Sequence, residues 1–113
     1  RFVVGRAIAY QRDGQLPRSL KLLDGALKAQ PGNAELWLFR GRYRVESSDC
    51  AGAARDFSRA TSLAPDNPAA YASLGLALMC TDDRAGARRA FERSLGLDPD
   101  QPSIREFLAN IGG

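Results

Sequence analysis

Apolar residues recur every three or four positions along most of the chain, which is the spacing of a helix with one buried face. Large and small side chains alternate on these faces, as in Trp37 followed by Gly41 and Phe57 followed by Ala60. Polar segments that contain Pro or Gly separate the periodic stretches. The pattern therefore predicts an all-α fold with about seven helices, near residues 2–13, 16–29, 34–46, 49–62, 68–80, 83–96 and 102–111.

The same kinds of residue return when the chain is shifted by 34 positions. A proline column stops helices, small columns let helices approach closely, and large columns fill the remaining space. The six columns are Pro31, Pro65 and Pro99; Leu23, Phe57 and Phe91; Ala26, Ala60 and Ser94; Ser19, Ala53 and Ala87; Val3, Trp37 and Tyr71; and Ala7, Gly41 and Gly75. A repeated period of this length predicts a solenoid of stacked helix pairs.

One domain is expected over residues 1–113, divided into units 1–33, 34–67 and 68–101 and a capping helix at 102–111. Asn67 before Pro68 marks a helix start, and Asp49 and either Asp82 or Asp83 are expected to cap the second helices of units two and three. In the last helix the apolar side covers the exposed end of the stack. That side consists of Ile104, Phe107, Leu108 and Ile111.

The second and third units resemble the tetratricopeptide repeat, whose pattern is W-x2-L-G-x2-Y, then A-x3-F, then P. The matching residues are Trp37, Gly41, Ala53, Phe57, Ala60 and Pro65 in unit two, and Tyr71, Leu74, Gly75, Ala87, Phe91 and Pro99 in unit three. Unit two departs from the pattern at Arg40 and Arg44, so we expect this end of its first helix to pack less tightly, with arginine stems covering apolar surface. The resemblance implies a right-handed superhelix of antiparallel helix hairpins whose first helices line a concave groove for peptides or helices of partner proteins.

The register of that resemblance points a mostly apolar set of side chains into the groove. An exposed apolar stripe usually marks a contact site, so the expected function is a protein–protein interaction scaffold that binds a peptide or an amphipathic helix, with Arg42 holding an acidic group at the rim. In the alternatives, the rest of the chain or a second copy covers the stripe, as in a homodimer, or some of these side chains belong to the core. The candidate groove residues are Val4, Ile8, Leu38, Phe39, Arg42, Val45, Ala72, Leu76 and Met79.

Some members of the resembled family grip the acidic tails of heat-shock chaperones with a clamp of lysine, arginine and asparagine. This sequence carries no cationic side chain at the corresponding positions, so binding of that type is not expected. Those positions are Val4, Ile8, Phe39, Ala69 and Ser73.

The net charge is +3, and almost all of the positively charged residues are arginine. Six arginines fall on the predicted outer face, where they form either a basic surface for acidic protein, phosphate or lipid, or a solvated face partly neutralised by Asp56, Asp83 and Glu92. We favour the solvated face and expect no nucleic-acid binding, because acidic residues are interspersed and the Ala, Gly, Arg and Leu content is typical of a GC-rich bacterial genome. The six are Arg55, Arg59, Arg84, Arg88, Arg89 and Arg93.

The chain contains no histidine, which excludes histidine-based metal sites and imidazole bases. It also has no glycine-rich phosphate loop and no nucleophile–base pair. We therefore expect neither an enzyme nor a bound metal or cofactor. The only methionine is Met79, so Arg1 is not a translation start and we expect a piece of a longer protein. An alternative function is a substrate-selecting appendage of a larger enzyme.

No apolar run approaches the roughly 20 residues that cross a bilayer. With no signal peptide visible either, we expect a soluble protein without membrane insertion, in the cytoplasm or periplasm. Cys50 begins one predicted helix and Cys80 ends the next, so the two thiols can lie near each other. They form either a disulfide, which would indicate an exported protein, or two small side chains with some burial.

Overall fold

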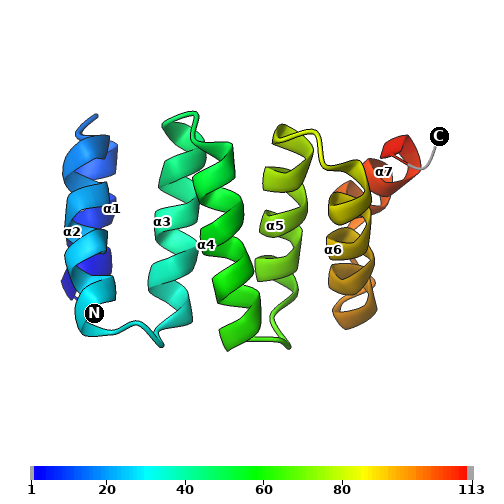
Figure 1. Ribbon diagram of the computed structural model, residues 1–113, viewed down its shortest axis with the longest axis horizontal. Helices are drawn as coiled ribbons and strands as arrows, with labels where there is room; N and C mark the ends of the chain where they lie inside the picture. Colours follow the sequence, from blue (N-terminus) through cyan, green and yellow to red (C-terminus); the bar gives the residue numbers. More distant parts are fainter. Residues whose placement is uncertain (1, 112–113) are drawn as a thin grey trace.

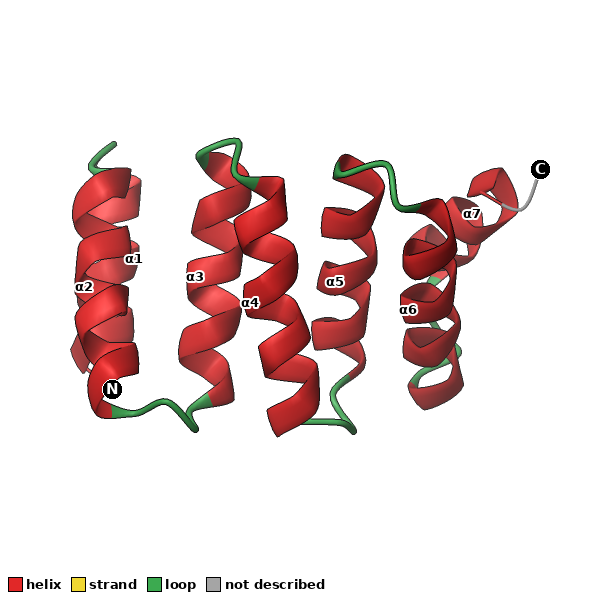
Figure 2. Ribbon diagram, in the orientation of Figure 1, coloured by secondary structure: helices red, strands yellow, loops and turns green. Residues whose placement is uncertain are grey.

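The computed structural model describes residues 2–111. This range contains helices and no strands (Figure 2). The predicted helix bounds agree with the observed ones to within one residue at each end. The helices are α1 (Phe2–Arg12), α2 (Leu16–Ala29), α3 (Ala34–Glu46), α4 (Cys50–Leu63), α5 (Pro68–Cys80), α6 (Arg84–Leu97) and α7 (Pro102–Ile111).

Consecutive helices form three antiparallel pairs, α1 with α2, α3 with α4, and α5 with α6, and α7 closes the row behind α6 (Figure 1). The pairs stand side by side along the long axis of a molecule that measures 40 × 25 × 21 Å. Each pair contacts the next one through α2 and α3 or through α4 and α5. The prediction of an all-α solenoid of helix hairpins is confirmed.

The turn within each pair contains one residue in the left-handed region. These residues are Gly14 with φ 74°, Ser48 with φ 66° and Asp82 with φ 63°, and they lie 34 positions apart. The turn therefore repeats its backbone geometry even though only the first copy uses glycine. Because Asp82 occupies this turn, Asp83 caps α6, with its carboxylate accepting a hydrogen bond from the N–H of Gly86 at 2.9 Å.

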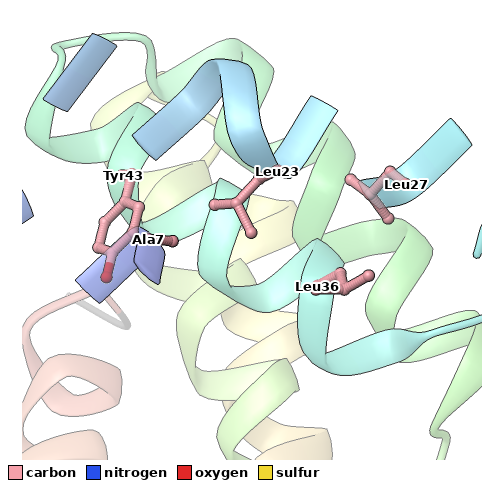
Figure 3. Close-up of a cluster of buried hydrophobic side chains, with 5 residues drawn as sticks. All are labelled: Ala7, Leu23, Leu27, Leu36 and Tyr43. Atoms are coloured by element: carbon pink, nitrogen blue, oxygen red, sulfur yellow. The ribbon is translucent and has the colours of Figure 1, made fainter. Parts of the chain in front are cut away.

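The core is divided into clusters along the row. Figure 3 shows the cluster that joins the first two pairs, formed by Ala7, Leu23, Leu27, Leu36 and Tyr43. Ala53, Phe57 and Ala77 join the second pair to the third, and Ala87, Phe91, Ile104 and Ile111 join the third pair to α7. Each cluster lies at a boundary between neighbours, as expected of a repeat in which every unit buries its face on the next.

The glycine columns are explained by the aromatic rings opposite them. A Cβ atom at Gly41 would lie 2.5 Å from the ring of Phe57, and one at Gly75 would meet the ring of Phe91 in the same way. Only glycine lets the first helix of each pair approach the second this closely. In the last cluster the Phe107 ring stacks on that of Phe91, with centroids 5.7 Å apart.

The two arginines that depart from the repeat pattern converge on a buried carboxylate. Asp56 of α4 is 1 % exposed and accepts hydrogen bonds from Arg40 Nε at 3.0 Å, Arg40 Nη2 at 2.9 Å and Arg44 Nη1 at 3.0 Å. A second branch of Arg40 reaches Asp24 of α2 at 2.9 Å. The hydrogen bonds to Asp56 raise the pKa of Arg40, so it stays charged. The prediction of loose packing at this end of α3 was wrong, because ion pairs replace the apolar contacts used elsewhere.

Candidate functional site

The first helices of the three pairs lie next to one another, since α3 contacts both α1 and α5. These helices carry all nine predicted groove residues. The structure divides the nine into a half-buried group, most of which packs against the core, and an exposed group that is free to contact a partner.

The half-buried group consists of Val4, Ile8, Leu38, Phe39 and Ala72. Val4 and Phe39 pack against the cluster between the first two pairs, Leu38 against the cluster between the second and third pairs, and Ala72 against the last cluster. These four side chains thus match the alternative in which part of the apolar stripe belongs to the core.

The exposed group lies in the second half of α3 and of α5. Val45 is 42 % exposed, Leu76 is 45 % exposed and Met79 is 37 % exposed. Large apolar side chains with this much exposure are uncommon enough, when they gather on one surface, to indicate a contact site. A pocket of about 360 Å³ opens between Val45 and Leu76. Its lining consists of Arg42, Val45, Glu46, Phe57, Ser73 and Leu76.

Arg42 supplies positive charge at the edge of this pocket. Its guanidinium lies over the ring of Phe39, 5.4 Å from the ring centroid, which holds it in place without neutralising it. Within residues 2–111 no carboxylate forms a salt bridge with Arg42. Glu46, one turn further on, instead accepts a hydrogen bond from Gln11 Nε2 at 3.0 Å. The arrangement leaves a guanidinium free to meet an acidic group beside an apolar pocket.

The pocket has one wall that the sequence-based interpretation did not assign to the groove. Phe57 comes from α4, a second helix, and its ring is buried between Gly41 and the pocket. The available signal in the sequence was the repeat column of large residues that contains Phe57, because these residues fill the space left by the column that contains Gly41. That column showed that the ring packs on α3, but not that it reaches the space between α3 and α5.

A second hollow of about 230 Å³ lies beyond Met79. It is lined by Met79, Asp82, Arg84, Asn110 and Ile111, so α7 contributes to it. At the same end of the helices Cys50 and Cys80 form a disulfide, with Cα atoms 6.0 Å apart. Of the two alternatives for these cysteines, the structure contains the bridge.

The outer face carries the predicted arginines, and five of the six are exposed, with Arg88 half-buried. Arg59 lies over the Trp37 ring at 6.0 Å and Arg93 over the Tyr71 ring at 5.6 Å, one repeat apart. The prediction that Asp56 partly neutralises this face was wrong, because its carboxylate is directed inward to Arg40. The face is accordingly more basic than the sequence suggested.

Residues 2–111 contain no group of three or more His, Cys, Asp or Glu side chains arranged to hold a metal ion. None of the helices in this range is both long enough and apolar enough to cross a membrane.

Comparison with known proteins yields one family and many structures. A family model described as the tetratricopeptide repeat matches residues 4–44 and 40–102. No curated protein sequence matches the chain.

Among solved structures, the first repeat domain of Spaghetti (RPAP3) bound to the HSP90 peptide SRMEEVD superimposes with a TM-score of 0.92 at 22 % identity, covering 98 % of this chain and 88 % of that one. The second such domain of human RPAP3, in complex with the HSP70 peptide SGPTIEEVD, gives a TM-score of 0.90 at 22 % identity, covering 98 % and 92 %. MamA from Desulfovibrio magneticus gives 0.88 at 21 % identity, covering 96 % of this chain and 62 % of that one. The high TM-scores establish a shared fold, and at identities this low they establish the fold alone.

Proposed function

Because the chain belongs to the tetratricopeptide repeat family, we propose that it is a protein-interaction module that binds a peptide or an amphipathic helix of a partner protein along α1, α3 and α5. One observation carries the proposal: Val45 and Leu76 are exposed around a pocket of about 360 Å³. Monomeric proteins seldom leave such side chains together in water without a partner for them.

The pocket suits one large apolar side chain of the partner. Its walls come from Val45, Phe57 and Leu76, which are apolar, while Ser73 is small and leaves room between α3 and α5. Met79 continues the apolar surface towards the end of α5, and its flexible thioether can adapt to different contacts. A segment with apolar residues on one side would bury these side chains together.

Arg42 adds a requirement for charge. The guanidinium is already placed on the Phe39 ring, so little side-chain freedom is lost when it meets a carboxylate. The preferred partner segment therefore carries Asp or Glu near its apolar anchor. Two structural neighbours were solved with peptides in which Glu stands next to Val, so the fold can accommodate an acidic and an apolar side chain together, although this chain lacks the clamp residues for such peptides.

A free acidic C-terminus is not the expected ligand. The family's chaperone clamp would require cationic or amide side chains where this chain has Val4, Ile8, Phe39, Ala69 and Ser73. None of these carries a positive charge that could form an ion pair with a terminal carboxylate. We propose an internal segment of a partner, held by apolar contact and one ion pair.

The test begins with selection of peptides from a displayed library on the oxidised chain. The selected peptides and SRMEEVD are then measured by calorimetry against the parent, Leu76→Asp and Arg42→Glu. Leu97→Asp is the matched control, because Leu97 of α6 is 37 % exposed and outside the pocket. We expect at least a tenfold loss of affinity for Leu76→Asp, corresponding to about 1.4 kcal/mol, and none for Leu97→Asp.

For Arg42→Glu we expect weaker binding only of those selected peptides that contain Asp or Glu, and SRMEEVD should bind poorly to every variant. Equal binding of the selected peptides to the parent and to Leu76→Asp would contradict the proposal. Light scattering on the free chain separates a second outcome, in which a second copy fills the groove and Leu76→Asp converts a dimer to a monomer.

A further inference from the structure

The disulfide connects two repeat units at the end of the proposed groove. Cys50 begins α4 and Cys80 ends α5, so the bridge joins the second pair to the third. The α3–α4 turn and the α5–α6 turn lie along the same edge of the row of helices, at the top in Figure 1. Met79 precedes one cysteine directly, and Val45 lies on the last turn of α3 before the other. The bridge is therefore well placed to hold the groove side of α5 against α4.

The boundary that it crosses has few other specific contacts. Between the first two pairs, Arg40 pairs with Asp24 at 2.9 Å and Gln11 donates to Glu46 at 3.0 Å. Across the second boundary, the described residues of α3 and α4 form no side-chain hydrogen bond or salt bridge with those of α5 and α6.

The buried cluster at this second boundary is also small. Two of its three buried residues are Ala53 and Ala77, and only Phe57 is large. An alanine side chain buries little apolar area, so it contributes less to holding two helices in register than the leucines at the first boundary. The helices α4 and α5 still pack closely on each other, and Leu38 and Leu74 add half-buried apolar contacts. The disulfide is accordingly the one specific side-chain link that supplements this packing within the described residues, and it acts at the last turn of α5.

The bridge is also accessible to a reductant. Cys80 is exposed and Cys50 is half-buried. Because the bridge lies at an exposed residue at the end of α5, a thiolate from solvent can reach this region without any opening of the core, and such access is one of the conditions for fast thiol–disulfide exchange.

From these observations we propose that the Cys50–Cys80 bridge is a reducible staple that controls the shape of the groove. The oxidised bridge fixes the last turns of α5, and the reduced pair of thiols releases them. The staple acts on α5 whether or not a partner binds, and only its effect on partner affinity rests on the proposed function. The stapled form belongs in an oxidising compartment, because the thiols of the cytosol keep exposed cysteine pairs of this kind reduced.

Opening the staple takes two electrons from a dithiol. One thiolate of the dithiol attacks a bridge sulfur, the protein S–S bond breaks, and a mixed disulfide forms while the other cysteine leaves as a thiolate that takes up a proton. The second thiol of the reductant then displaces the remaining cysteine. The dithiol ends as a cyclic disulfide, and the protein gains two hydrogen atoms.

The test compares the intact chain with and without dithiothreitol, and the variant Cys50→Ser with Cys80→Ser. We expect reduction to lower the midpoint of thermal unfolding of the parent by about 10–20 °C, since a bridge closing a loop of this length strongly constrains the unfolded chain. Amides in the last turns of α5 should exchange with deuterium at least tenfold faster, while those of α2 change less. The double variant should match the reduced parent in both measurements, and dithiothreitol should change neither its thermal midpoint nor its amide exchange.

Two results would overturn the proposal. The first is a thiol titration that finds two free thiols after treatment of the native chain with glutathione disulfide. The second is equal thermal midpoints and equal exchange in α5 for the oxidised and reduced parent. Both readouts are independent of any peptide, so a failure of the selected peptides to bind would count against the proposed function alone.

Discussion

Removing the carboxylate of Asp56 should be one of the most damaging single changes in the chain. Asp56→Ala leaves the guanidinium groups of Arg40 and Arg44 without the anion that both of them bind. The side chains of these two arginines are only 15 % and 25 % exposed. Breaking a buried ion pair from one side costs about 3–5 kcal/mol of the free energy of unfolding. Asp24 still contacts Arg40 at 2.9 Å, so we expect the lower end, about 3 kcal/mol.

The third unit shows which apolar residues could replace the whole ionic cluster in a second variant. It carries Leu74, Leu78 and Ala90 at the positions 34 residues after Arg40, Arg44 and Asp56. The triple variant Arg40→Leu, Arg44→Leu and Asp56→Ala thus installs an apolar set that the same fold already accommodates. Replacing a buried ionic cluster by apolar residues is neutral or stabilising by about 1–4 kcal/mol. We expect the triple variant to be at least as stable as the parent.

Urea unfolding followed by circular dichroism measures both variants, with the disulfide kept oxidised throughout. The slope of the free energy against urea should stay constant while the midpoint moves. A loss below about 1 kcal/mol for Asp56→Ala would mean that the pair behaves like a surface salt bridge and would refute the reasoning. A triple variant as unstable as the single one would refute the claim that the cluster substitutes for apolar packing.

Three further perturbations follow from individual contacts. Ser48→Gly should raise the free energy of unfolding by about 0.5–1 kcal/mol, because Ser48 has φ 66°, whereas Ser47→Gly at φ −87° should bring no gain in the same urea titration. Phe107→Asp removes the ring stacked on Phe91 and should cost about 2–3 kcal/mol, seen as faster hydrogen exchange in α6 than in α2. Burial raises the pKa of Tyr43 from 10.0, so the folded state retains a proton that the unfolded chain loses. Stability should therefore fall as the pH rises above about 10, and Tyr43→Phe should lessen that fall in urea midpoints compared across pH.

Helices, their order and their pairing could be read from the sequence. The spacing of Trp37 and Gly41, and of Phe57 and Ala60, is a local property that the chain carries at every copy of the repeat. Repetition averages out the ambiguity of any one helix, and each unit contacts only its neighbours, so the local pattern is enough to define the stack. Proline and capping residues then defined the helix bounds to within one residue.

The candidate groove could be listed from the register, but its members could not be ranked. Leu38 and Val45 both belong to the predicted stripe, yet Leu38 packs on the second cluster while Val45 is 42 % exposed. The difference depends on how closely α3 approaches α5 at each level of the helix. That approach is set by side chains distant in sequence, among them Phe57, which the register did not place in the groove.

The sequence by itself determined the repeat, the seven helices of residues 2–111 and the absence of histidine chemistry. The tertiary structure alone decided that Asp56 turns inward to Arg40 and that Cys50 meets Cys80. Sequence periodicity reports which face of a helix is buried, because that is a property of neighbouring residues. A salt bridge or a disulfide depends on distances of a few ångströms between different helices, and only the packed stack fixes those distances.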